Sequence, residues 1–202
     1  MARDNEALLT RQLDAIAQAA ANRGEEATTW VMAPMVATAV EAKWFADLCR
    51  ERGLTAGAMI EVPAAALMAD TIMPHLDFVS IGTNDLTQYT MAADRLSPQL
   101  AYLTDPWQPA VLRLIQHTCV VGRDNNVPVG VCGEAAADPM LACVLTGLGV
   151  TSLSAASTAV AGVGAQLAEL TFEQCEKMAE AAVNAEGPSE ARTNVIALLE
   201  EF

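Results

Sequence analysis

Two acidic residues, Glu61 and Asp85, each follow a short apolar run that is predicted to be a buried strand, residues 57–60 and 78–81. A carboxylate at the end of a buried strand is desolvated unless a cation or a hydrogen-bond donor meets it. Because neighbouring parallel strands lie about 4.8 Å apart, the two carboxylates can share one oxygen-preferring ion such as Mg²⁺. The pair therefore predicts a magnesium site, with water and a ligand phosphate completing the metal's coordination shell.

Each of these acidic residues also has a simpler interpretation. Taken singly, Glu61 is more readily explained as a solvated charge at the end of its strand, and Asp85 as the N-cap of the helix that follows. The metal site is preferred only because two consecutive strands both end in a carboxylate.

Two polar residues near this pair can contact a charged ligand. Asn84 offers both a donor and an acceptor, and Arg95 offers a planar fork that binds carboxylate or phosphate with two hydrogen bonds. The simpler alternatives are a turn asparagine and a surface ion pair between Arg95 and Asp94.

Cys132 differs from the other cysteines by its position, because it ends an apolar run, residues 127–131, and immediately precedes Gly133. Its thiol is predicted to face the mouth of a barrel, where it can move a proton. The five cysteines form no C-x-x-C pair, which indicates reduced thiols in an intracellular protein. The remaining four are predicted to be small buried core residues: Cys49, Cys119, Cys143 and Cys175.

Other residues with chemical potential are predicted to be structural. His75 and His117 fall in helical stretches without an acid or a serine at the spacing of a catalytic triad. Several methionines recur on apolar faces and are predicted to fill gaps in the core. They are Met32, Met35, Met59, Met68 and Met73.

The chain of 202 residues carries 25 acidic against 11 basic residues, a formal net charge of −14. This charge argues against binding along nucleic acid, although a metal can still create a local site for a small anion. No apolar stretch approaches the roughly 20 residues that span a bilayer. The N-terminus lacks the layout of a signal peptide, so a soluble, cytoplasmic protein is expected.

Short apolar runs alternate with helical stretches along most of the chain, which predicts parallel strands connected by helices. Residues 92–105 lack periodicity and are predicted to form a long ordered loop. The predicted strands are residues 30–33, 57–60, 78–81, 127–131 and 150–154. The predicted helices are an opening helix ending near Gly24, then residues 38–53, 64–73, 109–125, 138–148, 160–170, 171–183 and 189–199.

Two α/β architectures fit about five such strands. A doubly wound sheet is compatible with the count, but no G-x-G-x-x-G turn follows any strand. Polar groups at nearly every strand end favour a barrel, which closes with eight strands. We therefore expect a partial (β/α)8 TIM barrel of about the last five strand–helix units, with residues 1–202 in one domain.

Two segments resemble the signatures of phosphoenolpyruvate-utilising enzymes. They are GAMIEVPAAALMADTIMPHLDFVSIGTNDLTQYTMAADR, residues 57–95, and VGVCGEAAADP around Cys132. Residues 93–95, 106–115 and 153–155 also follow the pattern of enzyme I of the bacterial sugar phosphotransferase system. Pyruvate phosphate dikinase and phosphoenolpyruvate synthase are similar but match these stretches less well. The resemblance implies the C-terminal phosphoenolpyruvate-binding domain of a phosphotransferase.

The resemblance also implies a role for each candidate residue. Glu61 and Asp85 become the Mg²⁺ ligands, and Asn84, Asp85 and Arg95 the contacts to phosphoenolpyruvate. Cys132 becomes the proton donor to the enolate carbon, which yields pyruvate. The implied partners are a histidine-containing phosphocarrier protein, reached through an N-terminal domain, and a second copy of the chain in a homodimer.

Parts of the family pattern are not found in these 202 residues. There is no G-G-x-x-S-H acceptor segment, and no early strands with R-T-E and V-R-T arginines. We therefore expect the last five strands of the barrel, which alone do not complete phosphotransfer. The alternatives are a non-catalytic dimerisation or interaction module, or a fragment of one of the two similar enzymes.

Overall fold

A five-stranded parallel sheet runs through the computed structural model, which describes residues 5–23 and 28–202. Each strand pairs with the next one along the chain, in the order β1-β2-β3-β4-β5. This order lacks the reversal of a doubly wound sheet among the residues described. The strands are β1 (Trp30–Ala33), β2 (Thr55–Ile60), β3 (Phe78–Gly82), β4 (Val129–Cys132) and β5 (Ser152–Leu153).

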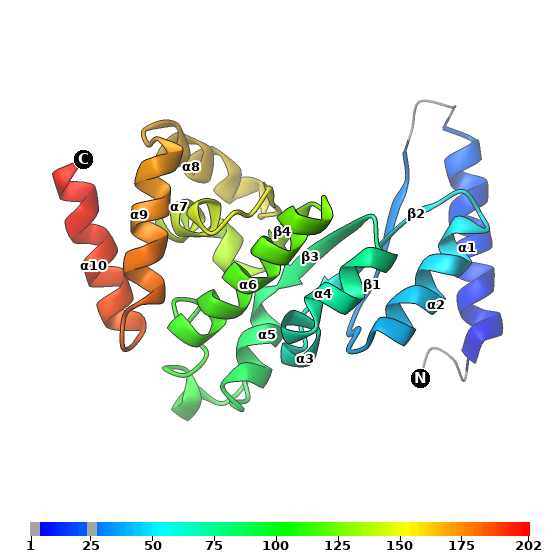
Figure 1. Ribbon diagram of the computed structural model, residues 1–202, viewed down its shortest axis with the longest axis horizontal. Helices are drawn as coiled ribbons and strands as arrows, with labels where there is room; N and C mark the ends of the chain where they lie inside the picture. The colour runs from blue at the N-terminus through cyan, green and yellow to red at the C-terminus, as the bar shows by residue number, and fades with distance from the viewer. Residues whose placement is uncertain (1–4, 24–27) are drawn as a thin grey trace.

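Helices connect successive strands, and Figure 1 shows α2, α4 and α6 side by side along one face of the sheet. Helices α7 to α10 gather at the end of the molecule opposite α1 (Figure 1). The α-helices are α1 (Glu6–Ala21), α2 (Ala39–Arg50), α3 (Pro63–Leu67), α4 (Ala69–Ile72), α5 (Thr83–Thr90), α6 (Pro109–Asn125), α7 (Pro139–Gly147), α8 (Ser157–Ala168), α9 (Phe172–Val183) and α10 (Pro188–Glu201). Short 3-10 helices are η2 (Met73–His75), η3 (Pro98–Leu100) and η4 (Glu134–Ala137).

The register of the sheet aligns the carboxyl ends of its middle strands. Ile60 pairs with Ile81, and Gly82 pairs with Cys132. Glu61, the residue after Ile60, therefore lies at the level of Gly82 and Cys132. Three strand ends from separate parts of the chain meet at one edge.

Side-chain hydrogen bonds cap the first turns of helices α2 and α7. Thr38 and Glu41 form a reciprocal capping box at the start of α2. The carboxylate of Asp138 accepts hydrogen bonds from the main-chain N–H groups of Met140 and Leu141, which caps α7. These caps fix the helices that follow β1 and β4.

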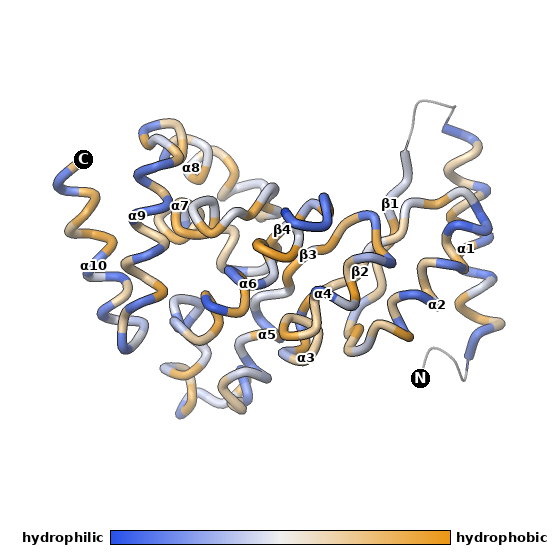
Figure 2. The backbone as a smooth tube through the Cα atoms, viewed as in Figure 1, coloured by the Kyte–Doolittle hydropathy of each residue, from blue (hydrophilic) through white to orange (hydrophobic). Residues whose placement is uncertain are grey.

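The helix-covered face of the sheet forms the main core. Ala58, Ile60, Val79 and Val131 are almost completely buried on it. Figure 2 shows hydrophobic residues along β3 and β4 in the middle of the molecule, and mixed colours along α1 and α10. Burial on this scale is what holds the parallel strands together.

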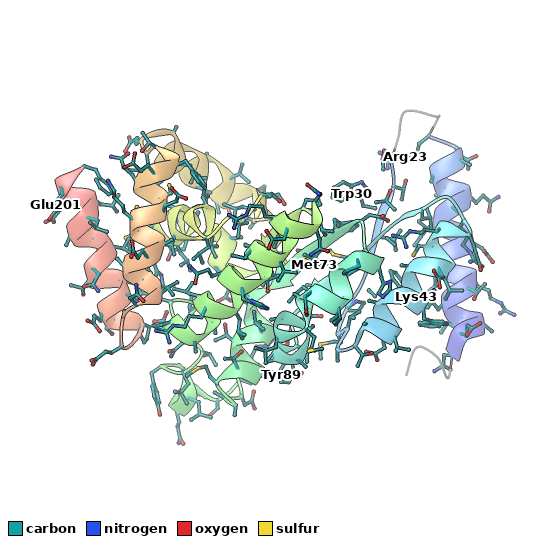
Figure 3. All side chains as sticks on the ribbon, viewed as in Figure 1. Arg23, Trp30, Lys43, Met73, Tyr89 and Glu201 are labelled. Atoms are coloured by element: carbon teal, nitrogen blue, oxygen red, sulfur yellow. The ribbon has the colours of Figure 1, made fainter. Side chains whose placement is uncertain are left out.

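The opposite face of the sheet borders a cavity. A cavity of about 500 Å³ is lined by residues of β1, β3, β4 and β5, among them Trp30, Phe78 and Ser152. The rings of Trp30 and Phe78 lie 4.5 Å apart between centroids. Trp30, labelled beside β1 in Figure 3, remains 57% exposed, so this face is open in the part of the chain that is described.

Most predicted elements are confirmed, and three predictions were wrong in detail. The helix expected at residues 64–73 is divided into α3, α4 and η2, because Met68 leaves the helical conformation at φ −102° and ψ 24°. The strand expected at residues 150–154 is reduced to Ser152–Leu153. The strand expected at residues 127–131 covers Val129–Cys132 instead. The long loop expected at residues 92–105 is confirmed, and it includes the short helix η3.

The prediction that the methionines fill the core was only partly right. Met73, labelled near the centre of Figure 3, is completely buried. Met32, Met35 and Met68 are 43%, 47% and 49% exposed. Apolar spacing indicated a buried face, but among the described residues nothing covers the open sheet face on which Met32 lies.

None of the helices described is both long enough and apolar enough to cross a membrane.

Candidate functional site

Glu61 is the most buried charged residue of the candidate site, with 4% of its surface exposed. It directly follows β2, and its Oε1 accepts a hydrogen bond of 2.7 Å from the main-chain N–H of Met35. On the other side it lies against Gly82, where an added Cβ would come within 2.6 Å of its Oε2. The interpretation of Glu61 as a solvated strand-end charge was therefore wrong.

Asp85 lies in the first turn of α5, three residues after the end of β3. Its carboxylate is partly exposed, and Oδ2 lies 3.9 Å from Nη1 of Arg95. The N-cap of α5 is Gly82, without a side-chain capping bond, so the interpretation of Asp85 as an N-cap was wrong. The carboxylate is available for a ligand, and the positive end of the helix favours a negative charge there.

The carboxylate oxygens at this edge are of the kind that Mg²⁺ prefers. Within the residues described, Met35 supplies the hydrogen bond to the Glu61 carboxylate and no second one is present. A buried carboxylate with one partner favours a cation beside it. No group of three or more His, Cys, Asp or Glu side chains that could hold a metal occurs in residues 5–23 and 28–202. Mg²⁺ commonly takes only one or two carboxylates and fills its shell with water and phosphate oxygens.

Asn84 connects the ends of two strands. Its Oδ1 accepts a hydrogen bond of 3.4 Å from the main-chain N–H of Glu134, fifty positions along the chain. Gly133 adopts φ +89°, and an added Cβ there would meet Thr83 Oγ1 at 2.7 Å. Only glycine fits this turn without strain. Asn84 lies inside α5 and holds the turn after β4, so the interpretation as a simple turn asparagine was wrong.

Cys132 is half-buried at the same edge of the sheet. Its thiol lies 3.4 Å from the main-chain oxygen of Ile81, to which it can donate. Its own main-chain oxygen accepts a hydrogen bond of 3.0 Å from Thr83 Oγ1. The strand-end position predicted for Cys132 is therefore what the structure shows.

The remaining cysteines are buried, as predicted. Burial raises the pKa of the Cys49 thiol to about 11 and those of Cys119 and Cys143 to about 12. Burial also raises the pKa of Cys175. These four thiols therefore stay protonated near neutral pH.

Arg95 lies in the exposed loop after α5. Its ion pair among the described residues is with Asp85, whereas Oδ1 of Asp94 accepts a hydrogen bond from the N–H of Leu96. The alternative of an Arg95–Asp94 pair was therefore wrong. The Arg95 side chain is 48% exposed, so the pair contributes little to stability, and Arg95 remains accessible to a ligand.

The two histidines lie outside this edge of the sheet. His75 ends η2, shortly before the amino end of β3, and His117 is exposed on α6.

Three residues that shape the site were missed by the sequence interpretation. They are Met35, Gly82 and Thr83, which act through a main-chain N–H, an absent side chain and a buried hydroxyl. The one signal available was the run Gly82-Thr83, a small residue and a hydroxyl between a strand and Asn84.

Comparison with known proteins identifies the family of this chain. Residues 1–172 match the family model described as "PEP-utilising enzyme, PEP-binding domain". The chain belongs to this family of phosphoenolpyruvate-utilising enzymes. The match agrees with the family that the sequence resemblance implied.

Curated members of the family are similar over most of the chain. The phosphoenolpyruvate-protein phosphotransferase of Streptomyces coelicolor is 51% identical over 198 residues, which are 97% of this chain and 35% of the relative. The protein of the same name from Mycoplasma genitalium is 36% identical, covering 94% and 34%. A multiphosphoryl transfer protein of Xanthomonas campestris is 41% identical, covering 92% and 23%. This phosphoenolpyruvate-binding domain thus spans about a third or less of these relatives.

Solved structures with little sequence similarity share the fold. A citrate lyase from Burkholderia xenovorans has a TM-score of 0.53 at 13% identity, covering 86% of this chain and 63% of that one. RipC from Yersinia pestis has a TM-score of 0.52 at 11% identity, covering 71% and 66%. At such identities the likeness concerns the α/β fold alone.

Proposed function

We propose that this domain binds phosphoenolpyruvate together with Mg²⁺ and supplies the substrate half of a phosphoenolpyruvate-protein phosphotransferase. The single observation that carries the proposal is the convergence of strand-end groups at one edge of the sheet. The phosphoryl acceptor is a histidine on a separate N-terminal domain, which passes the group to a histidine-containing phosphocarrier protein. The proposed site residues are Glu61, Asn84, Asp85, Arg95 and Cys132.

Glu61 and Asp85 would hold the ion, and Mg²⁺ supplies charge neutralisation at the phosphate when it is bound. Nη1 of Arg95 lies 3.9 Å from Oδ2 of Asp85, so the guanidinium would be near enough to bind a phosphate group placed beside that carboxylate. Asn84 is fixed at the start of α5 and offers an amide donor to the substrate.

The chemistry then divides into two bond changes. The phosphorus–oxygen bond of phosphoenolpyruvate breaks as phosphorus bonds to the acceptor nitrogen, through a loose transition state whose charge Arg95 offsets. The enolate that is left takes a proton at its terminal carbon from the thiol of Cys132, which gives pyruvate and a thiolate. Cys132 is half-buried at the edge where Glu61 follows β2, which suits a proton donor to a bound ligand.

The five strands are proposed to be the later strands of a (β/α)8 barrel. Sequential parallel order, helices on one face and the cavity of about 500 Å³ on the other support this. The curated relatives are about three times as long as this domain or longer, which leaves room for earlier strands. Those strands would pair with the open edge of β1 and bring the arginines that the family uses for phosphate.

A second candidate is a non-catalytic interaction module that retains the fold. An apolar groove of about 710 Å³ between α1, β1 and α2 favours it, together with the exposed indole of Trp30. Such a module would pair with a second copy of the chain and form a homodimer in the cytoplasm.

A fusion with part of a longer relative tests both candidates. The domain is joined to the N-terminal two thirds of the Streptomyces coelicolor relative, and pyruvate release from phosphoenolpyruvate is measured with a phosphocarrier protein present. We expect Mg²⁺-dependent pyruvate formation that falls by at least about a hundredfold in Cys132→Ala. A fusion that sediments as a stable dimer and never forms pyruvate would support the interaction module instead.

A further inference from the structure

We infer that Met35 is a positioning residue whose main-chain N–H orients the carboxylate of Glu61. The inference rests on the proposed function, because Glu61 is there a ligand of Mg²⁺. The loop after β1 would thus contribute to the site through its main chain and not through a side chain.

Met35 has an unusual main-chain conformation. Its φ is +54°, in the left-handed region that residues other than glycine seldom adopt. Its side chain is 47% exposed, so tight packing does not force the conformation. Strained dihedrals of this kind persist where the surrounding structure requires them, and they cluster at functional sites.

The left-handed turn directs the N–H of Met35 at Glu61. The hydrogen bond to Oε1 is 2.7 Å long, which is typical of a bond that a charged acceptor strengthens. The two residues are 26 positions apart and belong to the loops after β1 and β2. The bond therefore joins adjacent strand ends.

Gly82 completes the restraint from β3. An added Cβ at this position would lie 2.6 Å from Oε2 and 3.0 Å from the Cβ of Glu61. The carboxylate is thus confined between Met35 on one side and Gly82 on the other. Oε1 is occupied by the hydrogen bond, and Oε2 has no hydrogen-bond partner among the residues described. Groups that orient a metal ligand in this way typically change metal affinity by about 10- to 100-fold when they are altered.

Substitutions at position 35 separate positioning from packing. Met35→Gly removes the side chain but favours positive φ, whereas Met35→Val keeps an apolar side chain but strongly disfavours positive φ. If Met35 acts through its N–H, the glycine variant retains Mn²⁺ affinity and the valine variant loses it by about tenfold. If Met35 acts by packing in the groove beside α1, the order is reversed.

Asn126 provides a matched control. It also has positive φ, at +57°, but it caps the end of α6, where its main-chain N–H bonds to the carbonyl oxygens of Arg123 and Gly122. Asn126→Val introduces the same strain, so it should lower the melting temperature and leave Mn²⁺ affinity unchanged. Loss of affinity in this control would show that general destabilisation explains the effect at Met35, which would overturn the inference.

A measurement without metal tests the hydrogen bond directly. In ¹H–¹⁵N spectra of the 202-residue chain, the amide proton of residue 35 should resonate downfield and move upfield in Glu61→Gln and further in Glu61→Ala. An amide signal that is unchanged in both variants would overturn the inference even if the metal binds. A chain that shows the shift but binds no Mn²⁺ would overturn the proposed function and leave the hydrogen bond between Met35 and Glu61 established.

Discussion

The hydroxyl of Thr83 donates a hydrogen bond of 3.0 Å to the main-chain oxygen of Cys132, although the two residues are 49 positions apart. Thr83 is 2% exposed and is the first residue of α5. The bond ties the start of that helix to the end of β4. One buried hydroxyl therefore sets the spacing between the helix that carries Asn84 and Asp85 and the strand that carries Cys132.

We expect Thr83→Val to loosen this connection. The substitution keeps the shape of the side chain but removes the donor to the main-chain oxygen of Cys132, which should lower the free energy of unfolding by about 1–3 kcal/mol. Urea denaturation measures the loss. Thr151→Val is the control, because the Thr151 hydroxyl also bonds a β4 carbonyl, that of Val129, but on an exposed residue. Equal losses in the two variants would contradict the role given to Thr83.

Gly82→Ala is expected to displace the Glu61 carboxylate. The new Cβ would lie 2.6 Å from Oε2, so the carboxylate must move. Mn²⁺ affinity should fall by about tenfold or more, measured by the paramagnetic relaxation of bound water. Gly164→Ala is the control, because an added Cβ at this helical position in α8 meets nothing within 4 Å. It should leave Mn²⁺ affinity unchanged, and unchanged affinity in Gly82→Ala would contradict the account.

One thiol per chain is expected to react rapidly with a water-soluble disulfide reagent at pH 8. Cys132 is the half-buried thiol, whereas the others are buried. Burial raises the pKa of Cys119 and Cys143 to about 12, so their thiolates are scarce at this pH. Cys132→Ser should abolish the fast phase of the reaction. A fast phase that survives this substitution would show that another cysteine is accessible.

The buried thiols also predict how stability changes at alkaline pH. Folding raises the pKa of Cys49 from 9.0 to about 11, so the unfolded chain releases its proton first. This contribution to stability is fully present below about pH 9 and is lost as pH rises towards 11. Urea midpoints between pH 8 and 11 should fall less steeply in Cys49→Ala than in the original chain. Parallel curves for the two proteins would refute this linkage.

Local sequence signals were sufficient for most of the fold. Strand β1 has the predicted bounds because Pro34 follows it directly, and helix α6 has them because it begins at Pro109. The break at Met68 was missed because an alanine-rich run has the same apolar pattern whether or not one residue leaves the helix.

The site was less predictable than the fold. Acidic strand ends gave the positions of Glu61 and Asp85, since parallel strands bring their carboxyl ends to one edge. The orientation of Glu61 depends on a main-chain N–H 26 residues away, in a conformation that methionine rarely adopts. No residue type encodes such a contact, so only the folded structure reveals it.

Calorimetric titration of the 202-residue chain with phosphoenolpyruvate tests the central claim most directly. We predict that binding requires Mg²⁺ and is weakened by about tenfold or more in Glu61→Ala and in Asp85→Ala. Glu173→Ala, at an exposed glutamate paired with Lys177 on α9, should bind as the original chain does. Affinity that does not depend on Mg²⁺, or that is unchanged when Glu61 or Asp85 is replaced, would contradict the proposed site.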